Sequence, residues 1–188
     1  MNLPNKLTIA RVIAVPFFIA AYYFGWYVLA FIIFVAASLT DMLDGQIARK
    51  NNLVTNFGKI MDPLADKVLV YSALCLMIPF YVPAWMLIVI LAREFTVAGM
   101  RTVAASEGIV IAAGMSGKIK TVLQMVAVCL LLLVPAFPLF LPLWYVAQAF
   151  LWASLVMTIY SGVEYVLQNK QVFSMEQDKK EEKDGTQE

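Results

Sequence analysis

Long apolar stretches, each followed by a short break, are the dominant pattern of this 188-residue chain. No charged residue occurs from Val12 to Thr40, a stretch longer than the roughly 20 residues that one membrane-spanning helix needs. Gly25-Trp26 divides this stretch, and proline-containing turns at 79–83 and 135–142 interrupt later ones. The pattern predicts six apolar helices and a polar tail from 169 to 188. The expected helices cover about 8–24, 26–49, 60–79, 84–105, 117–134 and 143–168.

Composition agrees with a membrane protein. The chain is 62% hydrophobic, its mean hydropathy is +0.78, and its net charge of +1 gives no indication of a nucleic-acid partner. It contains no histidine, so acid–base chemistry has to come from carboxylates, lysine, tyrosine or bound water. Cys75 and Cys129 each lie inside an apolar stretch, where we expect small buried side chains and neither a disulfide framework nor a metal site.

The charged residues are distributed unevenly between the two ends of the predicted helices. The three predicted turns contain none, whereas basic residues gather toward the other ends, at Lys6, Arg11, Arg49, Lys50, Lys59, Lys118, Lys120 and Lys170. By the positive-inside rule these ends and both termini face the cytoplasm. Trp26, Trp85 and Trp144 fall at the opposite boundary, as an aromatic belt would. We therefore expect an all-α polytopic membrane protein with six transmembrane helices over residues 1–168 and a disordered cytoplasmic tail over 169–188.

Four aspartates interrupt the apolar pattern in the segment "DMLDGQIARKNNLVTNFGKIMDPLADK". Asp41 and Asp44 share one face of the second predicted helix, and Asp62 and Asp66 are four residues apart on the third. A short loop joins these helices as antiparallel neighbours, so the two carboxylate pairs can meet. Four carboxylates in one pocket repel unless cations neutralise them. Oxygen ligands without histidine or cysteine suit Mg²⁺, Mn²⁺ or Ca²⁺ rather than zinc.

Small and basic residues accompany these aspartates. Gly45 and Ala48 lie on the same helix face as Asp41 and Asp44. They either permit close helix packing or leave a slot for a flat group. Arg49 is suited to a phosphate. A solvated helix end is the plain alternative for the aspartates, but charges within membrane spans are costly and usually functional.

The spacing Asp41-x2-Asp44-Gly45-x2-Ala48-Arg49-x8-Gly58-x3-Asp62-x3-Asp66 is the signature of the CDP-alcohol phosphatidyltransferases, and this chain resembles that family. The segments "LPNKLTIARVIAVPFF", "AREFTVAGMRTVAASEG" and "GKIKT" also resemble the bacterial phosphatidylglycerophosphate synthases, a group within it. The wider resemblance covers about residues 1–125. It implies six transmembrane helices, a homodimer in the bacterial cytoplasmic membrane, and displacement of CMP from a CDP-linked lipid by an alcohol at the cytoplasmic edge.

The resemblance also implies roles for individual residues. Asp41, Asp44, Asp62 and Asp66 would surround one or two Mg²⁺ or Mn²⁺ ions, and Asp66 would also be the general base. Gly45 and Ala48 would line a cytidine slot, with Arg49 and Gly58 near the nucleotide. Asn5 and Thr8, expected on a short segment before the first helix, would touch the nucleotide too.

Four further cations are candidates for binding a phosphate on the incoming alcohol: Arg93, Arg101, Lys118 and Lys120. Arg93 could instead pair with Glu94 or a motif aspartate, and the lysines could be positive-inside flanks. We rank Arg101 and Lys118 highest because they lie near helix ends that a polar ligand can reach. Glycerol 3-phosphate, with CDP-diacylglycerol as donor, agrees with the resemblance, and inositol phosphate would also suit these cations. An ion-coupled transporter is the other class of function that intramembrane charges allow, although we find no internal repeat.

Overall fold

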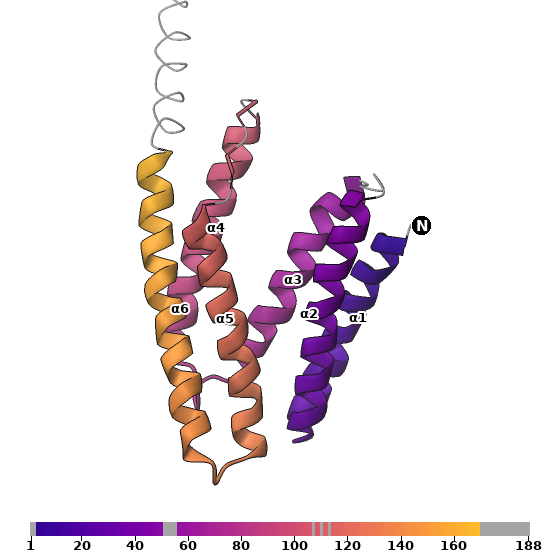
Figure 1. Cartoon of the computed structure of the whole chain (residues 1–188), viewed down its shortest axis with the longest axis vertical. Coiled ribbons are helices and arrows are strands. Elements are labelled where there is room, and N and C mark those ends of the chain that lie inside the picture. The colour runs from indigo at the N-terminus through magenta and orange to yellow at the C-terminus, as the bar shows by residue number, and fades with distance from the viewer. Residues whose placement is uncertain (1–2, 51–55, 107, 110, 113, 170–188) are drawn as a thin grey trace, which may run out of the picture. The chain divides into compact units, whose positions relative to one another are not determined.

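The computed structural model describes residues 3–50, 56–106, 108–109, 111–112 and 114–169. The described part of the chain is helical, as expected (Figure 1). The elements are α1 (Leu3–Tyr23), α2 (Tyr27–Lys50), α3 (Asn56–Leu76), α4 (Ala84–Ser106), α5 (Met115–Leu133), the 3₁₀ turn η1 (Val134–Ala136) and α6 (Leu141–Gln168).

The first helix begins earlier than the sequence pattern predicts. α1 starts at Leu3 instead of about residue 8, because Pro4 falls in the first turn, where its missing N–H costs no helical hydrogen bond. Asn5 and Thr8 therefore lie within α1, and the prediction that they precede the first helix is wrong.

Two helices end in the same hydrogen-bond pattern. After α1 the N–H of Trp26 bonds to the carbonyl of Ala21 (2.9 Å) and that of Gly25 to the carbonyl of Tyr22 (3.0 Å). Gly25 has φ of 75°, the left-handed conformation that this Schellman motif needs at its fifth position. Gly108 closes α4 identically, with φ of 74°. The glycine breaks read from the sequence are thus helix caps with a defined geometry.

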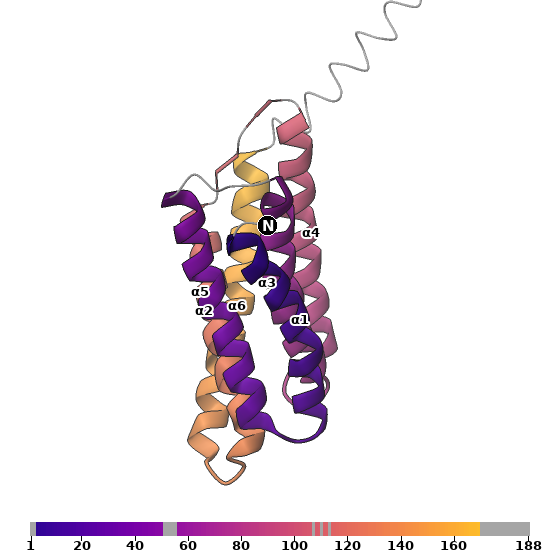
Figure 2. The same ribbon diagram turned by 90° about the vertical axis from the view of Figure 1, so that its right-hand side faces the viewer.

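The contacts divide the chain into two units, Met1–Ala84 with Met125–Leu151, and Trp85–Gln124 with Trp152–Glu188. In the first unit α1 packs against both α2 and α3 (Figures 1 and 2). The rings of Phe18 and Phe34 lie 6.0 Å apart, and Arg11 Nε donates to the carbonyl of Ala37 (3.3 Å). These contacts set α1 and α2 as antiparallel neighbours in a fixed register.

The second unit combines α4 with the first part of α5 and the later part of α6. Arg93 contacts Ser161 and, two turns along α4, Arg101 contacts Tyr165, so α4 and α6 run in the same direction. Between these contacts Val97 and Met100 bury against Tyr165. This α4–α6 seam holds most of the polar contacts considered below.

The structure supports the expected membrane location in part. Two described helical segments are long and apolar enough to cross a bilayer, Met115–Ala136 and Leu141–Gln168, while Leu7–Tyr23 and Tyr27–Thr40 are shorter apolar helices. Six spans and cytoplasmic termini stay predictions. The expectation that both cysteines are buried is wrong for Cys75 in α3, which is exposed, whereas Cys129 is half-buried.

Candidate functional site

The helices that carry the aspartate motif form as predicted. Asp41 and Asp44 belong to α2, and Asp62 and Asp66 belong to α3. The side chains of the first three lie outside the described residues, as do those of Asn5, Gly45, Ala48, Arg49 and Gly58. Among the side chains that are described, no group of three or more His, Cys, Asp or Glu residues could hold a metal ion. The meeting of the four carboxylates therefore stays a prediction.

Two predicted site residues of this unit are described in full. Asp66 is half-buried on α3, next to the buried Ala65. Thr8 is fully buried in α1, one turn from Arg11 on the same face. Because α1 and α2 are antiparallel and Arg11 meets Ala37, the register brings Thr8 level with the α2 turn that contains Asp41. This backbone register agrees with a role for Thr8 beside the motif.

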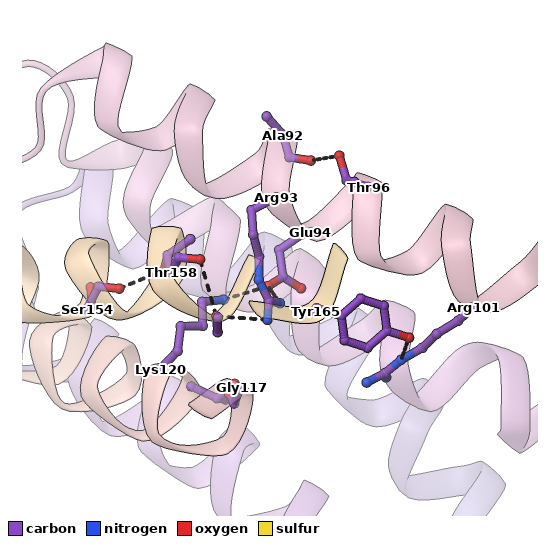
Figure 3. Close-up of polar contacts among 12 residues, drawn as sticks. Ala92, Arg93, Glu94, Thr96, Arg101, Gly117, Lys120, Ser154, Thr158 and Tyr165 are labelled. Atoms are coloured by element: carbon purple, nitrogen blue, oxygen red, sulfur yellow. Dashed lines mark hydrogen bonds and ion pairs between the residues drawn. The ribbon is translucent and has the colours of Figure 1, made fainter. Parts of the chain in front are cut away.

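In the second unit, three charged side chains form what we call the inner cluster: Arg93, Glu94 and Lys120. One carboxylate oxygen, Glu94 Oε1, accepts hydrogen bonds from Arg93 Nη1 (2.8 Å) and Lys120 Nζ (2.7 Å), as Figure 3 shows. Arg93 Nη2 also donates to Ser161 Oγ (3.0 Å). The cluster therefore joins α4 to both α5 and α6. The pairing of Arg93 with Glu94, one of the alternatives raised by the sequence, is confirmed.

The three charged side chains of the inner cluster are largely removed from water, so their charges need partners inside the protein. Only 14% of the Arg93 side chain, 12% of Glu94 and 5% of Lys120 are exposed. Two cations share one carboxylate, so the three side chains carry one net positive charge in a poorly solvated place. Gly162 makes room for this packing, since a Cβ atom there would lie 2.9 Å from Arg93 Cγ. The arginine is thus held by charge on one side and by helix backbone on the other.

Arg101 and Lys118, which we call the outer pair, are both exposed. Lys118 and Lys120 are two residues apart on α5 and so point to different sides of the helix, one outward and one into the cluster. Arg101 Nε donates to the hydroxyl of Tyr165 (3.1 Å), and its guanidinium carbon lies 5.4 Å from the centre of that ring. The four candidate cations thus fall into two classes that the sequence does not separate.

The face of α6 that meets α4 carries a row of hydroxyl groups missed by the sequence reasoning, which assigned no site residue to this helix. Its members are Ser154, Thr158, Ser161 and Tyr165. Thr158 donates to the carbonyl of Ser154 (2.7 Å) and Ser161 to that of Thr158 (3.2 Å). Steps of four, three and four residues keep the row on one helix face. This periodicity in an otherwise apolar helix was the available signal.

Tyrosine was one of the acid–base candidates left by the absence of histidine. In the turn between α3 and α4, burial and the neighbouring Tyr27 raise the pKa of Tyr81 above its ordinary value. This phenol is therefore protonated at neutral pH, and the turn supplies no base from this residue. Its backbone carbonyl accepts a hydrogen bond from Gln148 Nε2 (2.8 Å), which ties the turn to α6 within the first unit.

A family model for CDP-alcohol phosphatidyltransferases matches residues 1–160, so the chain belongs to the CDP-alcohol phosphatidyltransferase family.

Similar proteins with more specific names cover most of the chain. The CDP-diacylglycerol–glycerol-3-phosphate 3-phosphatidyltransferase of Bacillus subtilis (strain 168) is 46% identical over 184 residues, covering 89% of this chain and 95% of the relative. A protein of the same name from Rickettsia felis is 39% identical over 176 residues, covering 92% and 97%. A "probable phosphatidylglycerophosphate synthase" of Mycobacterium tuberculosis (strain H37Rv) is 39% identical over 172 residues, covering 88% and 80%. The resemblance read from the motif is confirmed.

Proposed function

We propose that this chain transfers the phosphatidyl group from CDP-diacylglycerol to sn-glycerol 3-phosphate, giving phosphatidylglycerophosphate and CMP. The observation that carries the proposal is similarity over nearly the whole length to proteins named for this reaction, one of them 46% identical. The motif of eight fixed positions on α2 and α3 supports the same chemistry.

In the proposed reaction, a hydroxyl oxygen of glycerol 3-phosphate forms a bond to the phosphorus that carries the diacylglycerol. The bond from that phosphorus to the oxygen bridging to CMP breaks, and CMP leaves with the electron pair. Asp66 takes the hydroxyl proton as general base. A half-buried carboxylate can do so at neutral pH when its surroundings balance burial against nearby charge.

Asp41, Asp44, Asp62 and Asp66 are the proposed ligands of one or two Mg²⁺ or Mn²⁺ ions, because their oxygens are the donors that these ions prefer. When bound, such ions neutralise the phosphates and stabilise the departing CMP. Asn5, Thr8, Gly45, Ala48, Arg49 and Gly58 are the proposed nucleotide contacts. The register of α1 on α2 supports Thr8 in particular.

For the acceptor phosphate we propose the outer pair as direct contacts. Arg101 and Lys118 are exposed, so a soluble phosphate can reach them. Arg93 and Lys120, which were also candidates, are engaged by Glu94 and contribute their net positive charge from inside the helix packing. We further propose six membrane spans, a site at the cytoplasmic face and a homodimer in a bacterial cytoplasmic membrane. A diacylglycerol donor supports the membrane location, because its tails stay in lipid.

The test is release of CMP by the purified protein from CDP-diacylglycerol, with glycerol 3-phosphate, inositol phosphate, free glycerol and serine as acceptors. We expect turnover with glycerol 3-phosphate, loss in chelator and recovery on adding Mg²⁺ or Mn²⁺. A preference for inositol phosphate would change the acceptor, and no CMP release with any alcohol would refute the transferase.

The base is tested by a pair of variants. Asp66→Asn should lower turnover about 10²-fold or more while CDP-lipid binding is largely kept. Asp41→Asn should weaken Mn²⁺ binding, measured directly on the protein, together with CDP-lipid binding. Equal binding losses in both variants would mean that Asp66 serves as a metal ligand like Asp41 and would remove its separate role as the base.

A further inference from the structure

Tyr165, in the last turn of α6, is held rigidly in the second unit. Only 7% of the residue is exposed, and it forms a buried cluster with Val97 and Met100 of α4. The partly buried Ile111 and Val166 pack against the same cluster. A tyrosine fixed on both sides in this way keeps its hydroxyl in one place, and a buried hydroxyl needs a polar partner.

That partner is Arg101. The hydroxyl of Tyr165 accepts a hydrogen bond from Arg101 Nε, and the guanidinium lies within cation–π range of the ring (Figure 3). An exposed arginine ordinarily samples many rotamers, and it loses that freedom when it binds a ligand. Contact with a buried ring removes part of this freedom in advance, because Nε is already hydrogen-bonded and the guanidinium carbon lies 5.4 Å from the ring centre.

The contact also decides which edge of the guanidinium is available. Arginine has five N–H donors, and Tyr165 takes the single one on Nε. Within the described residues the structure gives the Nη1 and Nη2 groups of Arg101 no other partner, and the side chain is exposed. Two parallel N–H groups on one edge match two oxygens of a phosphate monoester.

We propose that Tyr165 is a positioning residue that acts through Arg101 and holds its Nη edge toward the phosphate of the acceptor alcohol. The inference rests on the proposed function and deepens it, because it adds a residue outside the part of the chain that the family model matches, 1–160. It also gives α6 a part in acceptor recognition.

The test is Tyr165→Phe, which keeps the ring and its packing and removes only the hydrogen-bond acceptor. We expect the KM for glycerol 3-phosphate to rise about three- to tenfold, as for loss of one hydrogen bond. kcat and the KM for CDP-diacylglycerol should stay within about twofold. The matched control is Tyr160→Phe, because Tyr160 is exposed on the same helix, and it should leave all three constants unchanged.

A double-mutant cycle separates positioning from a structural role. In an Arg101→Ala background, Tyr165→Phe should change the KM for glycerol 3-phosphate by less than about twofold. An undiminished effect in that background, or an equal loss of kcat and of both affinities, would overturn the inference. If the unaltered protein releases no CMP with glycerol 3-phosphate, the proposed function fails; if it does and Tyr165→Phe leaves that KM unchanged, only the present inference fails.

Should Tyr165→Phe not be recoverable from membranes, Arg101→Lys carries the same test. Lysine keeps the charge, but its single ammonium cannot bond to Tyr165 and also present two parallel N–H groups to a phosphate. We expect a rise in the KM for glycerol 3-phosphate of at least about threefold. An unchanged KM would show that the orientation of a guanidinium is irrelevant and would overturn the inference.

Discussion

The inner cluster and the outer pair both contain cations, but the surroundings of these cations differ, and so do the roles that we propose for them. Arg93 and Lys120 are nearly buried and share the carboxylate of Glu94, whereas Arg101 and Lys118 are exposed. A buried cation must be balanced, so its first role is to hold helices together. An exposed cation close to such a framework is free to meet a ligand. Burial and partners therefore say more about the role of each cation than its position along the chain does.

The largest effect is expected from removing the charge that balances the inner cluster. Glu94→Gln removes the carboxylate charge that Arg93 and Lys120 share in a poorly solvated place, and we expect a loss of about 3 kcal/mol in the free energy of unfolding. Denaturant titration in detergent micelles measures it. Glu164→Gln is the matched control on α6, where the carboxylate accepts only an exposed hydrogen bond from Gln168 (3.3 Å). If both substitutions lower the free energy of unfolding equally, the inner cluster does not hold the helices together in the way we infer.

A smaller, functional effect is expected from the outer pair. Arg101→Ala should raise the KM for glycerol 3-phosphate about tenfold to a hundredfold, the equivalent of one charge-assisted hydrogen-bond pair of about 1.5–3 kcal/mol. The KM for the CDP-lipid should hardly change. Thr102→Ala, at the exposed neighbouring position, is the control. A loss of donor affinity would move Arg101 to the nucleotide half of the site, and no change in either constant would make it a flanking charge.

The close packing of Gly162 against Arg93 gives a third way to test the inner cluster. Gly162→Ala places a methyl group against Arg93 Cγ, where 2.9 Å is too close, and should destabilise the protein by about 1–3 kcal/mol. Gly99→Ala, on α4 with open space around it, should instead stabilise by about 0.5–1 kcal/mol through helix propensity. Thermal unfolding of the two variants in detergent should therefore shift in opposite directions. Shifts in the same direction would contradict the close packing at Gly162.

The smallest effect should come from Lys118. Its exposed ammonium forms no hydrogen bond or ion pair with the described part of the chain, so Lys118→Ala should raise the KM for glycerol 3-phosphate only about two- to fivefold. Added salt should shrink the difference, because an exposed charge is screened. An effect as large as that of Arg101→Ala would show that the two members of the outer pair contribute equally.

The fold was predictable where local rules decide it. The positions of glycine and proline in the sequence predicted the turns, and Gly25 and Gly108 do cap helices. The start of α1 was missed because Pro4 signals a break in general but is compatible with a first helical turn.

Within the candidate site, the helices that carry the motif were predictable, because the motif is local in sequence. The aspartates fall on α2 and α3 as the spacing requires. The separation of the four cations into a buried and an exposed pair could not be fully predicted from the sequence. The two-residue spacing puts Lys118 and Lys120 on different sides of α5, but only the packing of the helices shows which of them faces inward. Tyr165 was missed because a single aromatic residue in an apolar helix looks like ordinary core. Its partner, Arg101, is far away in sequence and comes from another helix.

The charges of α4 have a consequence for the order in which the protein is built. α4 carries Arg93 and Glu94 near its middle, and a charged residue there costs an isolated helix about 2.5–3.5 kcal/mol on entering a bilayer. The described segments apolar enough to cross a bilayer include α5 and α6 but not α4. Lys120, which pairs with Glu94, and Ser161, which accepts a hydrogen bond from Arg93, are synthesised after it. In the proposed membrane setting, α4 therefore leaves the ribosome before the helices that make its insertion favourable, and its final integration has to wait for them.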